Sequence, residues 1–511
     1  MPRLKSLEAN TSHDLAIVVS AVLIAIISMT ASAATFRLGV TSFPPSRGNP
    51  FITVSTTSTF VLANIYDSLV IADNDGKLHP ALAESWEMRD PLTWVFHLRP
   101  NVTYSNGERW DAAAAKAVLD FLREGSSAGN TFARDFSRLA AVNVEDSLTL
   151  VIKTTAPNLL LPQHMLFVFF VAPGRLAEVG MSGLAAEPIG TGSYKVARWG
   201  AAQLNLEAFA GSWRKPIVDR LEILALPDAT SREQALLTDR VDVGMALNPD
   251  QVQTLEAAGA RLYQRKPQRI TAMIFDTLSP KSPFRDVRVR QAMNFAVNRD
   301  AICRNLLGGM VSPVSQPALD IALGFNPDLE PYPYDPAHAR ELLVHAGYPD
   351  GFSFVYEFAP NTLPNDSAII QQIAADLDNV NVHMTILPLT FPQYARNVTQ
   401  GGWKGFAWSM DYANYFHDAL KPFYESLHSC AWYAPWFCDP AIEARVKAAA
   451  ESPDLAARTT LSRDLMRYYR DIAQSLFLYP VLGLDGVGPR VTHWQPWGDI
   501  LMLHTATLAA D

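Results

Sequence analysis

The stretch Gly402-Trp-Lys-Gly-Phe-Ala-Trp-Ser-Met-Asp-Tyr-Ala-Asn-Tyr-Phe416 gathers tryptophan, tyrosine and phenylalanine rings around a single acid, Asp411. Its first part, Gly405–Trp408, is short, apolar and preceded by glycines, which predicts a strand with both faces covered. The part from Ser409 to Asn414 is polar and predicts a loop that leaves the strand. The stretch therefore predicts a covered sheet that opens into a binding cleft.

Asp411 has two interpretations. As a ligand-binding residue, it would receive an ammonium group, while Trp408, Tyr412 and Tyr415 supply contact area and cation–π attraction. Ser409 would add a hydroxyl group to the same cleft. As a structural residue, Asp411 would cap a helix formed by the residues that follow it.

The length and composition indicate a multidomain globular protein. A chain of 511 residues exceeds what one hydrophobic core usually serves, and its 49% hydrophobic content is ample for packed cores. The formal net charge is −9, and the sequence has no dense run of Lys or Arg that could follow a phosphate backbone. We therefore expect no nucleic-acid partner.

Residues 1–34 have the pattern of a secretory signal. Arg3 and Lys5 supply the positive end, Leu15–Met29 the apolar run, and Ala31-Ser-Ala33 a small-residue cleavage site. A retained N-terminal anchor is the alternative. No later segment reaches the roughly 18 uninterrupted apolar residues of a membrane span, so we expect a soluble mature chain.

The three cysteines differ in their surroundings. Cys430 and Cys438 lie in one aromatic loop, and an exported chain favours a disulfide between them. Cys303 lies in a helical pattern and is expected to be a buried free thiol. A metal site formed by Cys430, Cys438 and His428 is the alternative, but it lacks a fourth clear ligand.

Near the N-terminus, a helix is expected over Ser55–Leu69, directly after a strand and a loop. Its Ser- and Thr-rich start, including Ser55 and Thr56, could offer hydroxyl groups and amides to a ligand. Ordinary helix capping explains the same residues. Further along, Pro80–Trp86 predicts a short helix, and the arginines of Pro283–Ile302 indicate a solvated helix face.

Several segments resemble the family 5 extracellular solute-binding proteins of ABC importers, which include dipeptide-, oligopeptide- and nickel-binding periplasmic proteins. These segments are Pro80–Trp86 (PALAESW), Tyr104–Ala112 (YSNGERWDA), Val287–Arg299 (VRVRQAMNFAVNR) and Asp335–Tyr348 (DPAHARELLVHAGY). The matches are spread over most of the chain after the signal.

The resemblance implies an α/β, two-lobed type II periplasmic-binding-protein fold with an extra subdomain in the first lobe. Two crossover strands, Ile270–Phe275 and Ser475–Val481, would form the hinge. The expected division is lobe 1 at 35–72, 185–270 and 478–511, the extra subdomain at 73–184, and lobe 2 at 271–477. Within lobe 2, the helix expected over Ser367–Leu377 and its two flanking strands predict a parallel βαβ unit.

The resemblance also implies a function. The protein is expected to be a monomer in the Gram-negative periplasm that captures a small solute and delivers it to ABC permease subunits. Asp411 aligns with the acid that receives a peptide's α-ammonium group, although Met410 replaces the family's glycine. A peptide or amino-containing solute is therefore the first choice.

The other ligand classes are a nickel or metal-chelator complex and a sugar or opine. Nickel-binding members place a Trp, a Tyr and a His near Trp408, Tyr412 and His428, but Pro162–Phe170 lacks the arginine that would hold a chelator. We therefore expect no metal site, with His428 as the weak candidate. A secreted hydrolase is the alternative of a different class, although the sequence lacks His-Glu-x-x-His and Gly-x-Ser-x-Gly motifs. We expect no enzymatic activity and no cofactor.

Overall fold

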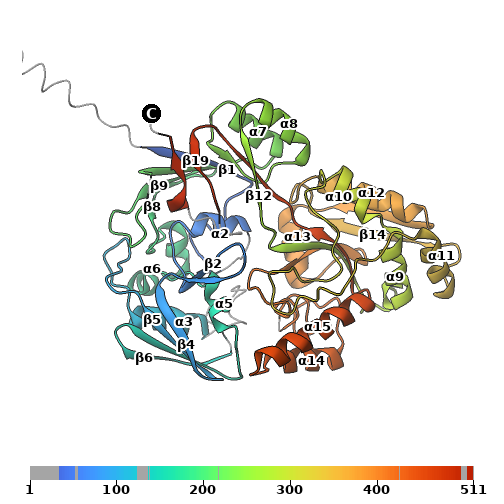
Figure 1. Cartoon of the computed structure of the whole chain (residues 1–511), viewed down its shortest axis with the longest axis horizontal. Helices are drawn as coiled ribbons and strands as arrows, with labels where there is room; N and C mark the ends of the chain where they lie inside the picture. Colours follow the sequence, from blue (N-terminus) through green and yellow to red (C-terminus); the bar gives the residue numbers. More distant parts are fainter. Residues whose placement is uncertain are drawn as a thin grey trace, which may run out of the picture.

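The computed structural model describes residues 34–51, 56–123, 136, 138–216, 218–424, 426–496 and 503–509, so the predicted signal lies outside them except for Ala34. Figure 1 shows two bodies side by side, one built mainly from the first half of the chain and the other from the second half. Within the described ranges, no helix combines the length and apolar character that a membrane crossing requires.

A seven-stranded mixed sheet forms the centre of lobe 1. Its parallel core is β1 (Thr35–Val40), flanked by β10 (Arg220–Ala225) and β11 (Val243–Gly244). Alternating apolar residues of β1, such as Phe36 and Leu38, are buried. The remaining strands are β8 (Tyr194–Trp199), β9 (Gln203–Ala208), β12 (Arg261–Arg265) and β18 (Gly483–Val487), and the helices are α2 (Thr56–Leu62), α7 (Ala229–Leu237) and α8 (Val252–Ala257).

A four-stranded antiparallel sheet lies beside lobe 1. Its order is β4 (Ala83–Asp90), β5 (Thr93–Leu98), β7 (Thr149–Thr154) and β6 (Leu139–Asp146), and α3 (Ala112–Arg123) packs on it. The predicted helix at Pro80–Trp86 is wrong, because these residues contribute to β3 (Leu78–Pro80) and β4. Pairing with β5, which sets Trp86 opposite Phe96, outweighs the local helix preference.

A five-stranded sheet forms lobe 2, in the order β15 (Val382–Pro388), β14 (Phe352–Phe358), β16 (Ala407–Ala413), β13 (Arg269–Phe275) and β17 (Ser475–Pro480). The predicted βαβ unit is confirmed, since β14 and β15 are parallel and α12 (Asp366–Asp378) joins them. The other main helices are α9 (Val287–Ala296), α10 (Arg299–Asn305), α11 (Pro336–His345), α13 (Phe391–Gln400), α14 (Pro440–Ala450) and α15 (Leu455–Asp471).

Two arginines of the segment at 283–302 are buried, so the predicted solvated face is wrong for them. The Arg290 guanidinium donates to the carbonyl oxygens of Phe284 at 2.7 Å and Ile472 at 2.8 Å. Arg299 donates to the Phe477 carbonyl oxygen at 2.6 Å. A buried guanidinium needs several acceptors. Arg290 thereby ties α9 to the residue Ile472, just before β17, and Arg299 ties α10 to β17 itself.

The chain crosses between the two large sheets twice. It passes from β12 to β13 through residues 266–268, and from β17 to β18 through residues 481–482. The two strands predicted to cross between the lobes correspond to β13 and β17. These strands pair with each other, antiparallel, inside lobe 2, so the crossings are made by the short links that join them to lobe 1. We propose the predicted division with two shifts: the four-stranded sheet falls within 73–184, but residues 269–270 and 478–480 belong to the lobe 2 sheet through β13 and β17.

Candidate ligand-binding site

Two adjoining cavities lie where the lobes meet. The lobe 2 cavity, of about 210 Å³, is lined by residues of β13, β14, α12, α13, β16 and β17. The crossover cavity, of about 80 Å³, is lined by both crossover links, by Thr41, Phe60 and Met245 of lobe 1 and by the 362–364 loop of lobe 2. Both cavities include Arg269, Thr362 and Leu363, so a ligand in the lobe 2 cavity faces lobe 1 through the crossover cavity.

An ion pair marks the polar end of the lobe 2 cavity. Arg269 Nη1 donates to Asp411 Oδ2 at 2.6 Å, and the two side chains are only 23% and 24% exposed. The register of β13 and β16 brings them together, because Thr271 pairs with Asp411 and Arg269 with Ala413. Sequence reasoning missed Arg269, since nothing in its local sequence states which residue of β16 lies beside it.

β16 continues through Ala413, so the predicted loop and the alternative helix cap at Asp411 are both wrong. Alternation along the strand places Ser409 and Asp411 in the lining of the cavity. Trp408 and Tyr412 point to the opposite face, where both are buried in the core. Trp408 stacks on Trp403 with ring centroids 4.6 Å apart, and neither Trp408 nor Tyr412 is among the described residues that line the cavity.

The other residues predicted to contact the ligand are Tyr415, Ser55 and Thr56. Tyr415 packs against Phe167 of lobe 1 with ring centroids 5.6 Å apart, and it is not among the described residues that line either cavity. Ser55 lies outside the described residues, and Thr56 is the first residue of α2. In the same helix, Phe60 lines the crossover cavity, so this helix does border the site.

His428 lies in the lobe 2 core rather than on a surface loop. Its ring stacks on Tyr412 at 4.0 Å, and Nε2 donates to the Asp411 carbonyl oxygen at 3.3 Å. Burial lowers its pKa from 6.5 to about 3. Within the described ranges, no three His, Cys, Asp or Glu side chains gather in a group that could hold a metal ion.

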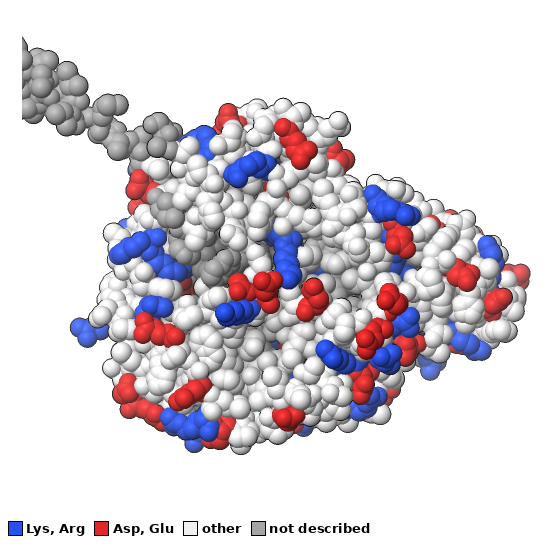
Figure 2. Space-filling model, viewed as in Figure 1, with Lys and Arg blue, Asp and Glu red and all other residues white. Residues whose placement is uncertain are grey.

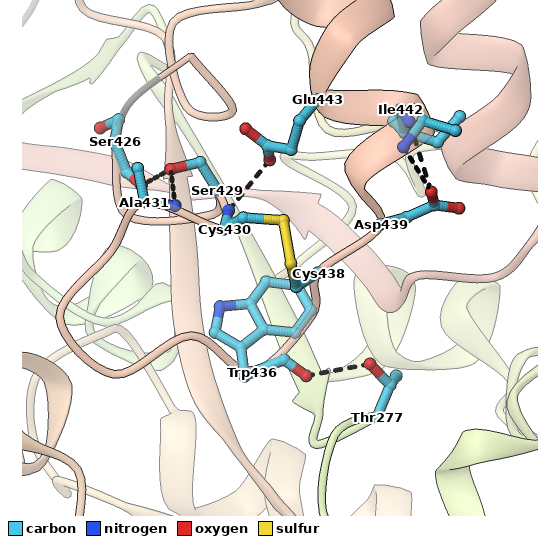
Figure 3. The surroundings of a disulfide bond; sticks show 11 residues. Thr277, Ser426, Ser429, Cys430, Ala431, Trp436, Cys438, Asp439, Ile442 and Glu443 are labelled. Carbon is cyan, nitrogen blue, oxygen red and sulfur yellow. Dashed lines mark hydrogen bonds between the residues drawn. A yellow bond between two sulfur atoms is a disulfide. The ribbon is translucent and has the colours of Figure 1, made fainter.

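The predicted disulfide is confirmed, with the Cα atoms of Cys430 and Cys438 4.7 Å apart. Figure 3 shows that Glu443 accepts a hydrogen bond from the Cys430 amide, at 2.9 Å, and that Thr277 donates to the Trp436 carbonyl oxygen, at 3.0 Å. These contacts hold the disulfide loop to lobe 2 away from the cavity lining. Cys303 is buried and unpaired as expected, and burial raises the pKa of its thiol to about 12.

Two tyrosines, Tyr356 and Tyr394, line the cavity together with Asp411. The Tyr394 hydroxyl donates to the Ser409 carbonyl oxygen at 2.9 Å, and desolvation raises the pKa of Tyr394 and of Tyr356 above the ordinary value of 10.0. Both phenols therefore stay neutral and offer only hydrogen bonds. Because Asp411 and Arg269 are only 24% and 23% exposed, an ion pair with either group is less screened than in bulk water.

A second set of contacts joins the lobes away from the crossovers. We call it the interlobe seam, made by Arg138 and Phe167 on one side and by Tyr415, Tyr424 and Glu451 on the other. Arg138 Nη1 donates to Glu451 Oε1 at 2.9 Å, and the Tyr424 hydroxyl donates to the same oxygen at 2.7 Å. On the face drawn in Figure 2, Lys and Arg side chains are interspersed with Asp and Glu side chains, including near the middle of the view.

The sequence profile described as "Bacterial extracellular solute-binding proteins, family 5 Middle" matches residues 77–433. The chain belongs to this family. It is 27% identical over 436 residues to the glutathione-binding protein GsiB of Pectobacterium atrosepticum, an alignment that covers 81% of this chain and 83% of the relative.

Solved structures of family members share the fold of this solute-binding protein. The dipeptide binding protein of Pseudoalteromonas sp. SM9913, in complex with Met-Leu, superposes with a TM-score of 0.83 at 17% identity, covering 93% of this chain and 100% of that one. DppA of Helicobacter pylori, in complex with the peptide STSA, gives 0.82 at 19% identity, covering 93% and 98%. These superpositions confirm the two-lobed type II architecture predicted from the sequence. The family match and the curated relatives confirm the role of solute-binding component of an ABC importer.

Proposed function

We propose that this protein binds a peptide-like solute with a free amino group in the lobe 2 cavity and presents it to the permease of an ABC importer. It would act in the periplasm of a Gram-negative bacterium, after removal of the signal in residues 1–34. The solute would be released unchanged, so we propose no enzymatic activity.

The Asp411–Arg269 pair carries this proposal. The two groups lie side by side at the junction of the two cavities, so a ligand ammonium can approach the carboxylate while a ligand carboxylate approaches the guanidinium. A carboxylate accepts more than one donor, so an ammonium group can join Arg269 there. The names of the relatives agree with this chemistry, since they bind glutathione, a dipeptide and a tetrapeptide.

Besides its contacts with Asp411 and Arg269 of lobe 2, such a ligand would contact lobe 1 when the lobes close. The crossover cavity is lined by lobe 1 residues, including Thr41 and Phe60, as well as by the 362–364 loop. A ligand shifts an open–closed equilibrium only through contacts that differ between the two states. Contacts to both lobes at the crossover cavity meet this condition.

The test compares Asp411→Asn with the unmodified protein by isothermal titration calorimetry. We expect the affinity for dipeptides with a free amino group to fall by about tenfold or more, and the weak binding of N-acetylated dipeptides to stay unchanged. Because the substitution also removes the carboxylate to which Arg269 donates, thermal unfolding of the ligand-free protein and an Arg269→Gln/Asp411→Asn double variant serve as controls. Equal losses for free and acetylated peptides would show that Asp411 is structural.

The absence of catalysis is tested separately. The purified protein is incubated with the same dipeptides and with aryl glycosides, and the products are followed by mass spectrometry. We expect both kinds of substrate to be recovered intact. Turnover at a substantial rate that is lost in Asp411→Asn would replace the carrier function by that of a secreted hydrolase.

A further inference from the structure

The lobe 2 cavity has an apolar wall beyond the Asp411–Arg269 pair. Side chains from β14, α12, α13 and the 362–364 loop line it: Phe358, Leu363, Ile369, Ile370, Ile373 and Phe391. Three of them, Ile369, Ile370 and Ile373, are buried positions on one side of α12, so they add an aliphatic surface to the cavity that the ion pair also lines. Such a wall adds no hydrogen bond, so it favours apolar atoms of a ligand over water.

Phe391 is the exposed part of this wall. It lines the cavity and is still 55% exposed, so much of its ring can be covered further by a bound group. It opens α13, a helix with no buried residue, whose start is fixed by a capping box between Thr390 and Gln393. The helix holds the ring at the cavity rim, where a bound apolar group would cover it.

The charges of the cavity oppose a second acidic group on the ligand. Two carboxylates, Asp366 and Asp411, line the cavity together with one cation, Arg269. Asp366 Oδ2 accepts hydrogen bonds from the amides of Thr362 at 2.9 Å and Leu363 at 3.2 Å, so it holds the loop in place. An acidic ligand side chain in this cavity would lie among apolar groups and near two acids, which is costly.

We infer that the lobe 2 cavity is a subsite for a large aliphatic or aromatic side chain of the peptide-like ligand, with Phe391 and Leu363 as its specificity-determining residues. This inference rests on the proposed function, because the amino group at Asp411 fixes which part of the ligand enters the cavity. The cavity volume of about 210 Å³ leaves room for a side chain of the size of leucine or phenylalanine.

The size of the effect follows from the burial of apolar surface. Covering a leucine or phenylalanine side chain completely favours binding by roughly 10- to 100-fold over glycine. Removal of the half-exposed Phe391 ring deletes only part of the wall, so about a fivefold loss is expected for an apolar peptide. The affinity for a glycine peptide should fall less than twofold, because such a peptide leaves the apolar wall uncovered both in the unmodified protein and in Phe391→Ala.

The test is calorimetry with Gly-Gly, Leu-Gly, Phe-Gly, Gly-Leu, Gly-Phe, Glu-Gly and glutathione as ligands. The variants are Phe391→Ala, Phe391→Trp and Leu363→Ala, with Val344→Ala as the control, because Val344 is 52% exposed on α11 and remote from the cavity. We expect a leucine or phenylalanine peptide to bind at least tenfold more tightly than Gly-Gly or Glu-Gly. Phe391→Ala and Leu363→Ala should lower this preference, and Phe391→Trp and Val344→Ala should retain it.

The outcomes separate this inference from the proposed function. Equal affinities for glycine, acidic and apolar peptides would overturn the apolar subsite and leave peptide binding intact. Tighter binding of glutathione or Glu-Gly than of the apolar peptides would also overturn it. If none of the ligands binds, while native mass spectrometry of the purified protein shows a different co-purified solute, the proposed function itself fails.

Discussion

The interlobe seam allows a test of closure by a substitution far from the cavity. Glu451 follows α14 in lobe 2, and its carboxylate accepts from Arg138, which precedes β6 of the four-stranded sheet. Burial acts to raise the pKa of Glu451, but hydrogen bonds from Arg138 and Tyr424 outweigh it and lower the pKa below 4.5. The seam pair is therefore charged at neutral pH, and it weakens only as the pH falls through this lowered pKa.

Glu451→Gln keeps the shape and the acceptor oxygen but removes the charge. A hydrogen bond between charged groups contributes about 1.5–3 kcal/mol, and a neutral one about 0.5–1.5 kcal/mol. The Arg138 and Glu451 side chains are 20% and 22% exposed, so solvent reduces the difference, and we expect a loss of about 1 kcal/mol. If the seam forms only in the closed state, the closure equilibrium shifts by that amount and the affinity falls about fivefold.

The assay combines calorimetry with small-angle X-ray scattering. Glu145→Gln is the matched control, because Glu145 pairs with Arg89 at 2.6 Å but both residues lie in the same four-stranded sheet. We expect Glu451→Gln to weaken ligand binding about fivefold, with an unchanged calorimetric stoichiometry, and Glu145→Gln to leave the affinity unchanged. Equal affinities in Glu451→Gln and the unmodified protein would refute the reasoning, since the seam would then not distinguish the closed state.

Two further predictions concern stability. Replacing Cys430 and Cys438 by alanine should lower the free energy of unfolding by about 2–3 kcal/mol, with ligand affinity changed less than twofold; an altered ligand preference would mean that the disulfide loop reaches the site. Burial lowers the pKa of His417 to about 4 and that of His428 to about 3, so the unfolded state takes up their protons first as the pH falls below 6.5. Stability measured by urea unfolding should therefore drop between pH 6.5 and 4.5, by roughly 2 kcal/mol for each histidine, and drop less in His428→Phe.

Local sequence patterns predicted most of the secondary structure. Periodicity predicted α12 and the parallel strands β14 and β15 on either side of it, and Asp111 caps α3, accepting from the Ala114 amide at 2.9 Å. The failure at Pro80–Trp86 has a tertiary cause, because its residues pair with β5. Strand pairing is a long-range choice that short-range helix preference does not report.

The candidate site was predicted only in part. Asp411 and Ser409 line the cavity, but the rings of Trp408 and Tyr412 lie on the other face of β16. The sequence analysis assigned Ser409–Asn414 to a loop, and residues of a loop are not constrained to alternate between two faces. It therefore did not separate Asp411 and Ser409 from Trp408 and Tyr412, as a strand does. Had the strand been extended through Ala413, alternation alone would have separated the two pairs.

The sequence by itself determined the family, the two-lobed architecture, the disulfide and one acid of the cavity. These depend on motifs, spacing and short-range periodicity, which a single chain displays directly. Only the tertiary structure decided that Arg269 lies beside Asp411, that Arg290 and Arg299 are buried, and that apolar side chains line the same cavity as the ion pair. Each of these depends on strand register or on packing between segments far apart in the chain, and such contacts leave no local signal in the residues that make them.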